Sequence, residues 1–393
     1  MFRRIGRSAL AVAMAALVLS GCSSPTGSGA GAGGVEGTDV IKIGVSAPLT
    51  GEIAALGQST RNAVEMAAEE VNAAGGIDVG GKKLKVRMII EDDQNSPEQT
   101  ASVFQKLIHQ DQVVAFIGSQ SSKATNAGAP IANDAKVPAI SPWATNPIVT
   151  EGKPYMFRAC FIDPFQGYVA AKFAREHLKA QRAAVLYDVA SDYNKGLAEV
   201  FRKEFEKMGG TITAYETYTT GDKDFSAQLT KIKATNPDVL FLPNYFNEVP
   251  LQVQQARKLG LNVTFLGGDG WDSPKLVELG GADMEGTYFT NHYTPTADSP
   301  AVKEFVEKFK ARYGQVPDAA AALTYDAARI LFQAIERAGS LDRDQIRDAI
   351  AATEGFQGVT GTITYAGKND PVKPAVVLKV EGGQFKYETT VNP

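Results

Sequence analysis

The chain has 393 residues, of which 44% are hydrophobic and 21% are charged, and its formal net charge is −4. A chain of this length is expected to form two domains rather than one. The mildly acidic balance, without a basic stripe, argues against nucleic acid as a partner. The two cysteines and the three histidines (His109, His177 and His292) are scattered, so we expect no internal disulfide, no metal site and no cofactor.

The first 22 residues have the three parts of a bacterial lipoprotein signal. Three arginines at the start are followed by an apolar stretch at 8–19, which is too short to span a bilayer. It ends in LSGC at 19–22, which resembles a lipobox, where cleavage leaves Cys22 as a lipid-bearing N-terminus. A plain secretory signal with a chance cysteine is the alternative. Loss of the three arginines would move the net charge from −4 to −7. Residues 23–38, rich in Gly and Ser, are expected to be a flexible tether.

From residue 40 onward, apolar strand patterns alternate with helix patterns. Each unit spans roughly 25–35 residues, the size of a βα module with parallel strands. The first run has expected strands at 40–48, 83–90, 113–118 and 137–141, and expected helices at 59–74 and 97–109, with one more helix before the last strand. No run of apolar residues in this body is long enough to span a membrane.

The alternation repeats after residue 155 and then changes. The second run has expected strands at 156–160, 183–187, 211–218, 238–243 and 263–267, and expected helices at 166–179, 194–208, 225–234 and 248–259. A strand at 286–293 is followed by helices at 301–313, 319–338 and 343–352 and by late strands at 361–365, 374–380 and 384–390. Such a return of the chain is typical of two interdigitated α/β lobes with several crossovers, rather than of serial domains.

Ten segments spread over about 350 residues carry a family resemblance. In order they are KIGVSAPLTGEIAALGQ, VNAAGGIDVGGKKLKV, EDDQNSPEQT, AFIGSQSS, AISPWATNP, DFSAQLTKIKATNPDVLFLP, QQARKLGL, FLGGDGW, TYDAARIL and VTGTITYAGKND. They resemble the type I periplasmic solute-binding proteins of ABC importers, in the branched-chain amino-acid-binding (leucine/isoleucine/valine-binding) group, here in lipoprotein form. Each segment is a weak motif alone, and their order makes the resemblance specific.

The resemblance implies an α/β fold of two Rossmann-like lobes joined by three crossovers, with the ligand in the cleft between the lobes. We expect the crossovers near 160–164, 290–293 and 365–371. Lobe 1 is then expected to comprise 39–161 and 292–366, and lobe 2 to comprise 162–291 and 367–393.

The stretch 116–147 contains two strand ends that run into loops of Gly, Ser, Thr and Asn. Ligands of open parallel sheets bind at such carboxyl ends of strands. By the resemblance, Ser122 and Thr145 hold the carboxylate of an amino acid, with help from backbone groups of Trp143, Ala144 and Thr145. Helix capping and turn formation, the commoner roles of Ser and Thr, are the structural alternative.

The remaining predicted contacts come from the second lobe. Asp269, between glycines after a strand, occupies a position that is acidic in the family and pairs with the ligand amine; a plain Asp-Gly turn is the alternative. Tyr193 and Tyr245 align with cleft positions, where a Tyr ring can contact an apolar ligand side chain while its hydroxyl finds a partner. Loop packing is the alternative for both.

Two departures from the family pattern leave the ligand open. Trp143 occupies a position that is small in leucine-type binders, and Leu56 stands where those binders tend to have an aromatic residue. The paired cysteines of some relatives are also missing. A smaller or differently shaped amino acid, or another small polar solute such as an amide or urea, remains possible. We interpret Asp163 as a turn residue at a presumed hinge.

The sequence therefore predicts an extracytoplasmic binding protein, anchored to the cell membrane by lipid on Cys22. It would capture a small amino acid or related ligand and deliver it to the permease subunits of an ABC importer, as a monomer. A ligand sensor for a signalling partner is the alternative. We expect no enzyme, because the sequence has no GxSxG or HExxH motif and no plausible Ser–His pair.

The lipid anchor can be tested by Cys22→Ser. Because lipid attachment needs the cysteine thiol, the variant is expected to move from the membrane fraction to the soluble extracytoplasmic fraction, as followed by immunoblotting. A variant that stays in the membrane fraction would refute the lipobox interpretation.

Overall fold

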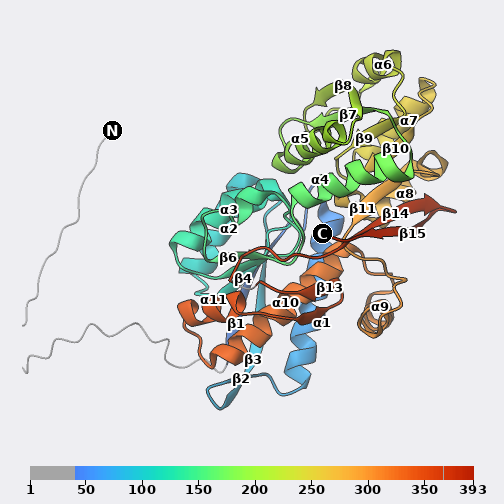
Figure 1. Cartoon of the computed structure of the whole chain (residues 1–393). Coiled ribbons are helices and arrows are strands. Elements are labelled where there is room, and N and C mark those ends of the chain that lie inside the picture. Colours follow the sequence, from blue (N-terminus) through green and yellow to red (C-terminus); the bar gives the residue numbers. More distant parts are fainter. Residues whose placement is uncertain (1–39, 366) are drawn as a thin grey trace, which may run out of the picture. The chain divides into compact units, whose positions relative to one another are not determined.

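The computed structural model describes residues 40–365 and 367–393 (Figure 1). The predicted signal segment, Cys22 and the tether lie outside the described residues. Among the helices of the described residues, none is long and apolar enough to cross a membrane. Cys160 is buried and its thiol is free.

The first sheet has six strands in the order β2-β3-β1-β4-β5-β6. β2 pairs antiparallel with β3, and the other pairs are parallel. The strands are β1 (Val40–Ala47), β2 (Ile77–Val79), β3 (Lys82–Asp92), β4 (Ala115–Ile117), β5 (Ala139–Ser141) and β6 (Met156–Arg158).

Helices cover both faces of this sheet. Ile43 and Val45 of β1 belong to the core shared with α1 (Ala54–Ala73) and α10 (Ala319–Ala338). Phe116 of β4 packs in a separate core with Phe104 of α2 (Pro97–His109) and Ala129 of α3 (Ser122–Asp134). The short apolar strands are therefore buried on two sides, as in doubly wound α/β folds. Two further helices, α9 (Pro300–Tyr313) and α11 (Arg343–Ala351), precede and follow α10.

The second sheet has seven strands in the order β15-β14-β11-β10-β9-β7-β8. The five strands β7 to β11 run parallel to one another. β14 pairs antiparallel with β11, and β15 pairs antiparallel with β14. The strands are β7 (Arg182–Asp188), β8 (Thr211–Tyr218), β9 (Val239–Leu242), β10 (Thr264–Gly267), β11 (Tyr288–Asn291), β14 (Ala375–Glu381) and β15 (Gln384–Val391).

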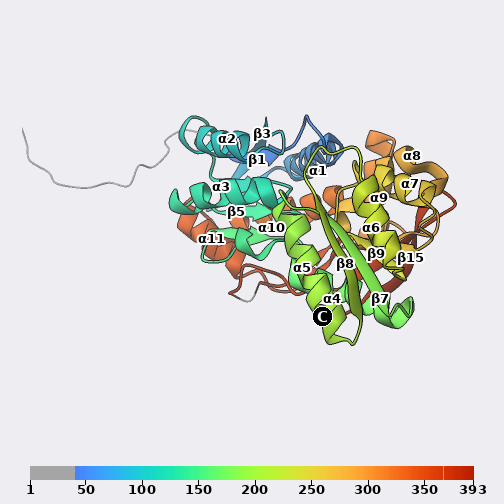
Figure 2. The same ribbon diagram turned by 90° about the horizontal axis from the view of Figure 1, so that it is seen from above.

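This sheet is also covered on both faces. Val185 and Phe241 pack with Phe201 of α5 (Asp192–Lys207), and α4 (Asp163–Lys172) lies beside α5 (Figure 2). Leu240 packs in the other core with Val253 of α7, on the face that holds α6 (Ser226–Ala234), α7 (Val249–Lys258) and α8 (Pro274–Gly280). A separate hairpin joins β12 (Phe356–Gly358) to β13 (Gly361–Ile363).

The fold class predicted from the sequence is confirmed. The chain builds the first sheet, passes to the second between β6 and β7, returns after β11 to α10 on the first sheet, and enters the second again at β14. The residue boundaries of the two lobes and of the crossovers stay predictions.

Several elements differ from the predicted ones. α1 begins at Ala54 rather than at residue 59, and its N-cap, Ile53, offers no side-chain hydrogen bond, so the usual capping signal is missing. The helix expected at 166–179 begins at Asp163 as α4 and ends in a π-helical segment, Phe173–His177. The three-residue strands β2 and β12 and helix α8 were not predicted.

A buried guanidinium organises the loop after β5. Arg158, at the end of β6, has no exposed side-chain surface, and its Nε atom lies 2.5 Å from Asp370 Oδ1. Its Nη1 atom donates to the carbonyl oxygens of Ala144, at 2.8 Å, and Asn146, at 3.1 Å, and its Nη2 atom donates to Thr150 Oγ1 at 2.7 Å. A planar group with five donors can hold several acceptors at once, so Arg158 fixes the backbone course of residues 144–150.

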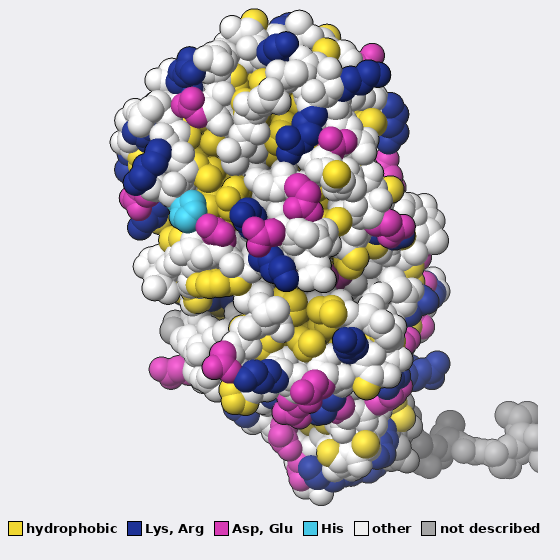
Figure 3. Space-filling view, turned by 90° about the vertical axis from the view of Figure 1, so that its right-hand side faces the viewer, with side chains coloured by type: hydrophobic (Ala, Val, Ile, Leu, Met, Phe, Trp, Pro, Cys, Tyr) yellow, Lys and Arg dark blue, Asp and Glu magenta, His cyan; other side chains and the backbone are white. Residues whose placement is uncertain are grey.

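Charges of both signs are interspersed on the face shown in Figure 3, where Lys and Arg side chains lie among Asp and Glu side chains and hydrophobic patches.

The close packing of α2 on α3 predicts a cost for Gly128→Ala. A Cβ atom at Gly128 would lie 2.8 Å from Phe104 Cε2, so the added methyl group strains the core despite the better helix propensity of Ala. We expect a loss of about 1–3 kcal/mol in the free energy of unfolding, measured by urea denaturation. Phe104→Leu in the same chain should make the Gly128→Ala cost smaller. Equal costs in both backgrounds would contradict the packing explanation.

A second prediction concerns Asp163, at the start of α4. Burial raises its pKa from 3.8 to about 7, against an opposing contact with the Thr145 hydroxyl. Between these two values the folded state binds more protons than the unfolded state, so the Asp163 contribution to stability is lost as the pH rises. Asp163→Asn should therefore gain unfolding temperature relative to wild type between pH 4 and pH 8, by about 2–4 °C or more.

The exposed Asp134 provides the control for this measurement. Asp134→Asn should leave the pH profile of the unfolding temperature unchanged. An Asp163→Asn profile parallel to that of wild type would contradict the assignment.

Candidate functional site

Two loops that follow neighbouring strands of the first sheet form one wall of a pocket. β4 and β5 are parallel, so their carboxyl ends lie at the same edge. Ser121 is the N-cap of α3, and Ser122 is the first residue of the helix. The Ser122 hydroxyl accepts a hydrogen bond from the backbone N–H of Asn146 at 3.2 Å, which joins the two loops. Its own O–H stays available to an anionic ligand group at the N-terminus of a 13-residue helix.

The second loop contains Trp143, Ala144 and Thr145. Trp143 lines the pocket, whereas Ala144 and Thr145 do not, although both are buried. The Ala144 carbonyl accepts from Arg158, and the Thr145 carbonyl accepts from the backbone N–H of Asp163 at 2.9 Å. The Thr145 hydroxyl lies close enough to the Asp163 carboxyl to influence its pKa, but it makes no hydrogen bond of normal geometry among the described residues. In this arrangement Ala144 and Thr145 shape the loop behind the wall.

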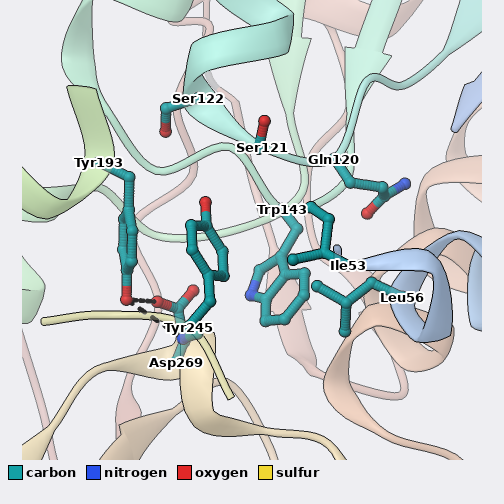
Figure 4. A pocket seen from close by; sticks show the side chains of 10 residues that line it. Ile53, Leu56, Gln120, Ser121, Ser122, Trp143, Tyr193, Tyr245 and Asp269 are labelled. Atoms are coloured by element: carbon teal, nitrogen blue, oxygen red, sulfur yellow. Dashed lines mark hydrogen bonds between the residues drawn. The ribbon is translucent and has the colours of Figure 1, made fainter. Parts of the chain in front are cut away.

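The opposite wall comes from three strand ends of the second sheet. Tyr193 lies in the first turn of α5, Tyr245 follows β9, and Asp269 follows β10. The two tyrosine rings are tilted against each other, with centroids 5.2 Å apart. Both side chains line the pocket with Asp269 (Figure 4). The structure thus brings together five of the seven ligand contacts predicted from the sequence.

The pocket includes residues that the sequence prediction did not assign. Ile53, Leu56, Gln120, Ser121 and Gly270 also line it. Gln120 lies between two serines in the loop after β4, where its position alone could have marked it as a contact. Ile53 precedes α1, whose early start was not predicted.

Three buried donors surround the Asp269 carboxylate. Oδ1 accepts from the Tyr193 hydroxyl and from Gln166 Nε2, each at 2.8 Å, and Oδ2 lies 2.8 Å from His292 Nε2. Gln166 belongs to α4, and His292 follows β11. A carboxylate has about four acceptor positions, so one remains for a ligand. Neither Gln166 nor His292 was predicted to be near the site.

His292 donates a hydrogen bond to Asp269 but does not neutralise its negative charge. Burial lowers the pKa of His292 below its usual value, and the hydrogen bond and charge of Asp269 only partly oppose this. The ring stacks on Phe161, with centroids 3.7 Å apart. A neutral imidazole that donates from Nε2 leaves the negative charge of Asp269 uncompensated. The site therefore favours a cationic ligand group near Asp269.

The glycines around Asp269 allow this close packing. A Cβ atom at Gly268 would lie 2.5 Å from the Tyr193 hydroxyl oxygen, and one at Gly270 would lie 2.9 Å from the Asn244 carbonyl oxygen. Side chains at these positions would displace Tyr193 from Asp269. The Gly-Asp-Gly sequence thus serves the site by close approach and not only by forming a turn.

Hydrogen bonds also link the two walls next to the pocket. Asn126 Nδ2 of α3 donates to Asp192 Oδ2 at 2.8 Å, and Asn146 Nδ2 donates to the Asp192 carbonyl oxygen at 3.1 Å. Asp192 begins α5, so these bonds join the first sheet's helix and loop to the helix that carries Tyr193.

The pocket is small. The space between its lining side chains, part of which is open to solvent, is about 250 Å³. Within residues 40–365 and 367–393, no group of three or more His, Cys, Asp or Glu side chains is arranged to hold a metal ion.

Comparison with known proteins places this geometry in a family. The sequence profile of the periplasmic binding protein family matches residues 40–384. The Leu/Ile/Val-binding protein homolog 1 of Brucella suis is 34% identical over 360 residues, which cover 90% of this chain and 95% of that protein.

Two solved structures are similar over the same region. The leucine-binding protein LivK of Thermotoga maritima has a TM-score of 0.85 and 40% identity, and the match covers 90% of this chain and 99% of that one. The branched-chain amino-acid transporter substrate-binding protein LivJ of Streptococcus pneumoniae, solved in complex with isoleucine, has a TM-score of 0.84 and 35% identity, with 90% and 100% covered. The chain belongs to the periplasmic binding protein family, in the group of solute-binding proteins that includes these branched-chain amino-acid binders.

Proposed function

We propose that the pocket captures a small amino acid and that the loaded protein delivers it to the permease subunits of an ABC importer. The observation that carries the proposal is the polarity of the pocket walls. The hydroxyl of Ser122 at a helix N-terminus faces the site from the first sheet, and the carboxylate of Asp269 faces it from the second. These groups complement the carboxylate and the ammonium of a zwitterion.

The proposed carboxylate clamp consists of Ser122 with Thr145 and the backbone of Trp143, Ala144 and Thr145. The Thr145 hydroxyl lies beside the buried Asp163 carboxyl, and the Thr145 backbone belongs to the same loop as Trp143. Thr145 does not line the pocket directly, so it would join the clamp after a small rotation or through the loop backbone. The amine would bind Asp269, and the rings of Tyr193 and Tyr245 would contact the rest of the ligand.

A ligand held in this way contacts elements of both sheets. Its binding free energy then favours the arrangement in which the two walls are close, which is the requirement for ligand-driven closure. The bonds of Asp192 to Asn126 and Asn146 would add to that arrangement. A closed form distinguishable from the open one is what a permease needs in order to select loaded protein.

The rest of the proposal concerns the location of the protein in the cell and its role in transport. The protein would act outside the cytoplasm, held to the membrane by lipid on Cys22, as a monomer that performs no catalysis. Family membership supports the extracytoplasmic location and the transport role. The B. suis relative is named for binding leucine, isoleucine and valine, and the S. pneumoniae protein was solved with isoleucine, which supports an amino acid as the ligand here.

Asp269→Asn tests the proposed amine contact. Asn keeps the shape of the side chain, and its Oδ1 atom can still accept from Tyr193 and Gln166, which would both lose their partner in Asp269→Ala. His292 keeps a partner in the tautomer in which Nε2 accepts from the new Nδ2 atom. Calorimetric titrations would use two ligand pairs that differ by the amine: L-leucine with 4-methylpentanoate, and L-asparagine with succinamate. We expect Asp269→Asn to weaken amino-acid binding by about 10- to 100-fold and to leave binding of the deaminated analogues nearly unchanged.

Glu248→Gln is a matched control. Glu248 is a buried carboxyl that lines the adjacent hollow, outside the pocket, and its Tyr218 hydrogen bond can be kept by Gln. The affinities of the Glu248→Gln variant for the same ligands should stay within about threefold of those of the wild type, which is a difference in binding free energy of less than 1 kcal/mol. If Asp269→Asn weakens each amino acid and its deaminated analogue equally, Asp269 does not bind the amine.

A further inference from the structure

The pocket has a second polar region apart from the Asp269 carboxylate. Figure 4 shows Gln120, Ile53 and Leu56 on the side of the pocket away from Tyr193, with the Trp143 ring between the two sides. Ile53 and Leu56 are apolar, as expected around an amino-acid side chain. Gln120 introduces an amide into the same wall.

The polar atoms of this region lack partners. Gln120 is 1% exposed, and neither its Oε1 nor its Nε2 atom has a hydrogen-bond partner among the described residues. Trp143 is 5% exposed and its Nε1 atom also has no partner, but this atom lies on the edge of the ring toward Tyr245 (Figure 4). Buried amide groups are nearly always hydrogen-bonded in folded proteins, because desolvation without a partner is costly. The two unpaired atoms of Gln120, a residue that lines the pocket, point to a ligand that pairs with them.

An aliphatic ligand side chain cannot fill this role. It would cover the Gln120 donor and acceptor while offering no hydrogen bond. A carboxamide supplies both an acceptor and donors, which matches the amide of Gln120. A carboxylate or ammonium side chain would need a counter-charge, and apart from Asp269, already assigned to the amine, the residues that line the pocket are uncharged.

We propose that the side chain of the bound amino acid is short, neutral and hydrogen-bonding, with a carboxamide as the best match, and that Gln120 is the residue that selects it. This inference rests on the proposed function, amino-acid capture, and narrows its ligand class. The pocket then differs in specificity from a site for branched aliphatic side chains, while the contacts to the amine and the carboxylate stay the same.

Isosteric ligand pairs isolate the hydrogen bonds from size. L-Asparagine and L-leucine have side chains of nearly the same shape, as do L-threonine and L-valine. Dissociation constants of the wild-type protein for all four would be measured by calorimetry. We expect asparagine to bind at least about tenfold more tightly than leucine, and threonine to bind more tightly than valine by a smaller factor, since a hydroxyl can make fewer hydrogen bonds to Gln120 than a carboxamide can.

Gln120→Met tests the residue itself. Met keeps the length of the side chain and removes both hydrogen-bonding atoms, so the asparagine-to-leucine preference should fall by about tenfold or more. Gln105→Met, at an exposed position of α2, is the matched control and should preserve the wild-type preference. Thermal unfolding of each variant verifies that it is folded. Should Gln120→Met fail to fold, the wild-type isostere preference decides the question.

The outcomes separate the inference from the proposed function. Leucine binding as tight as asparagine binding in the wild type overturns the inference and leaves amino-acid capture standing. An asparagine preference that survives Gln120→Met overturns the assignment to Gln120. If none of the four amino acids binds at millimolar concentration, both amino-acid capture and the inference fall.

Discussion

The Asp269 carboxylate is the constraint on which the site depends. It is 2% exposed, and a buried carboxylate is tolerated only where donors surround it. Tyr193, Gln166 and His292 supply these donors from α5, α4 and the segment after β11. Three parts of the chain far apart in sequence are therefore oriented toward a single anion. Because each donor also has its own packing partners, the network fixes the wall of the pocket and not only one side chain.

The choice of donors decides what the anion can still do. An arginine or lysine at the position of His292 would neutralise Asp269 and leave little attraction for a ligand amine. Burial keeps His292 toward its neutral form, so it orients the carboxylate while the charge remains available. The same division appears at Ser122, whose oxygen accepts from the Asn146 backbone while its proton stays free. The hydrogen bonds that hold Asp269 and Ser122 in place thus leave the charge of Asp269 and the hydroxyl proton of Ser122 available to a ligand.

Much of this arrangement could be predicted from the sequence because it follows local patterns. Alternating strands and helices indicated the α/β lobes, and the family resemblance named Ser122 and Asp269, both of which follow strand ends. Gln166 and His292 could not be identified in this way. Gln166 lies 103 residues from Asp269 in the sequence and His292 lies 23 residues from it, and neither belongs to a motif. Gln120 is a different case: its place in the predicted loop could have marked it as a contact, but its lack of a hydrogen-bond partner is visible only in the structure.

The buried guanidinium of Arg158 has a consequence for the loop that carries Trp143. It holds the carbonyl groups of Ala144 and Asn146, so the course of that loop is set by an interaction behind the wall rather than by the side chains in front of it. The backbone at residue 143 is thus held independently of the size of the side chain there. The Trp143 ring lines the pocket from a loop whose course it does not have to support.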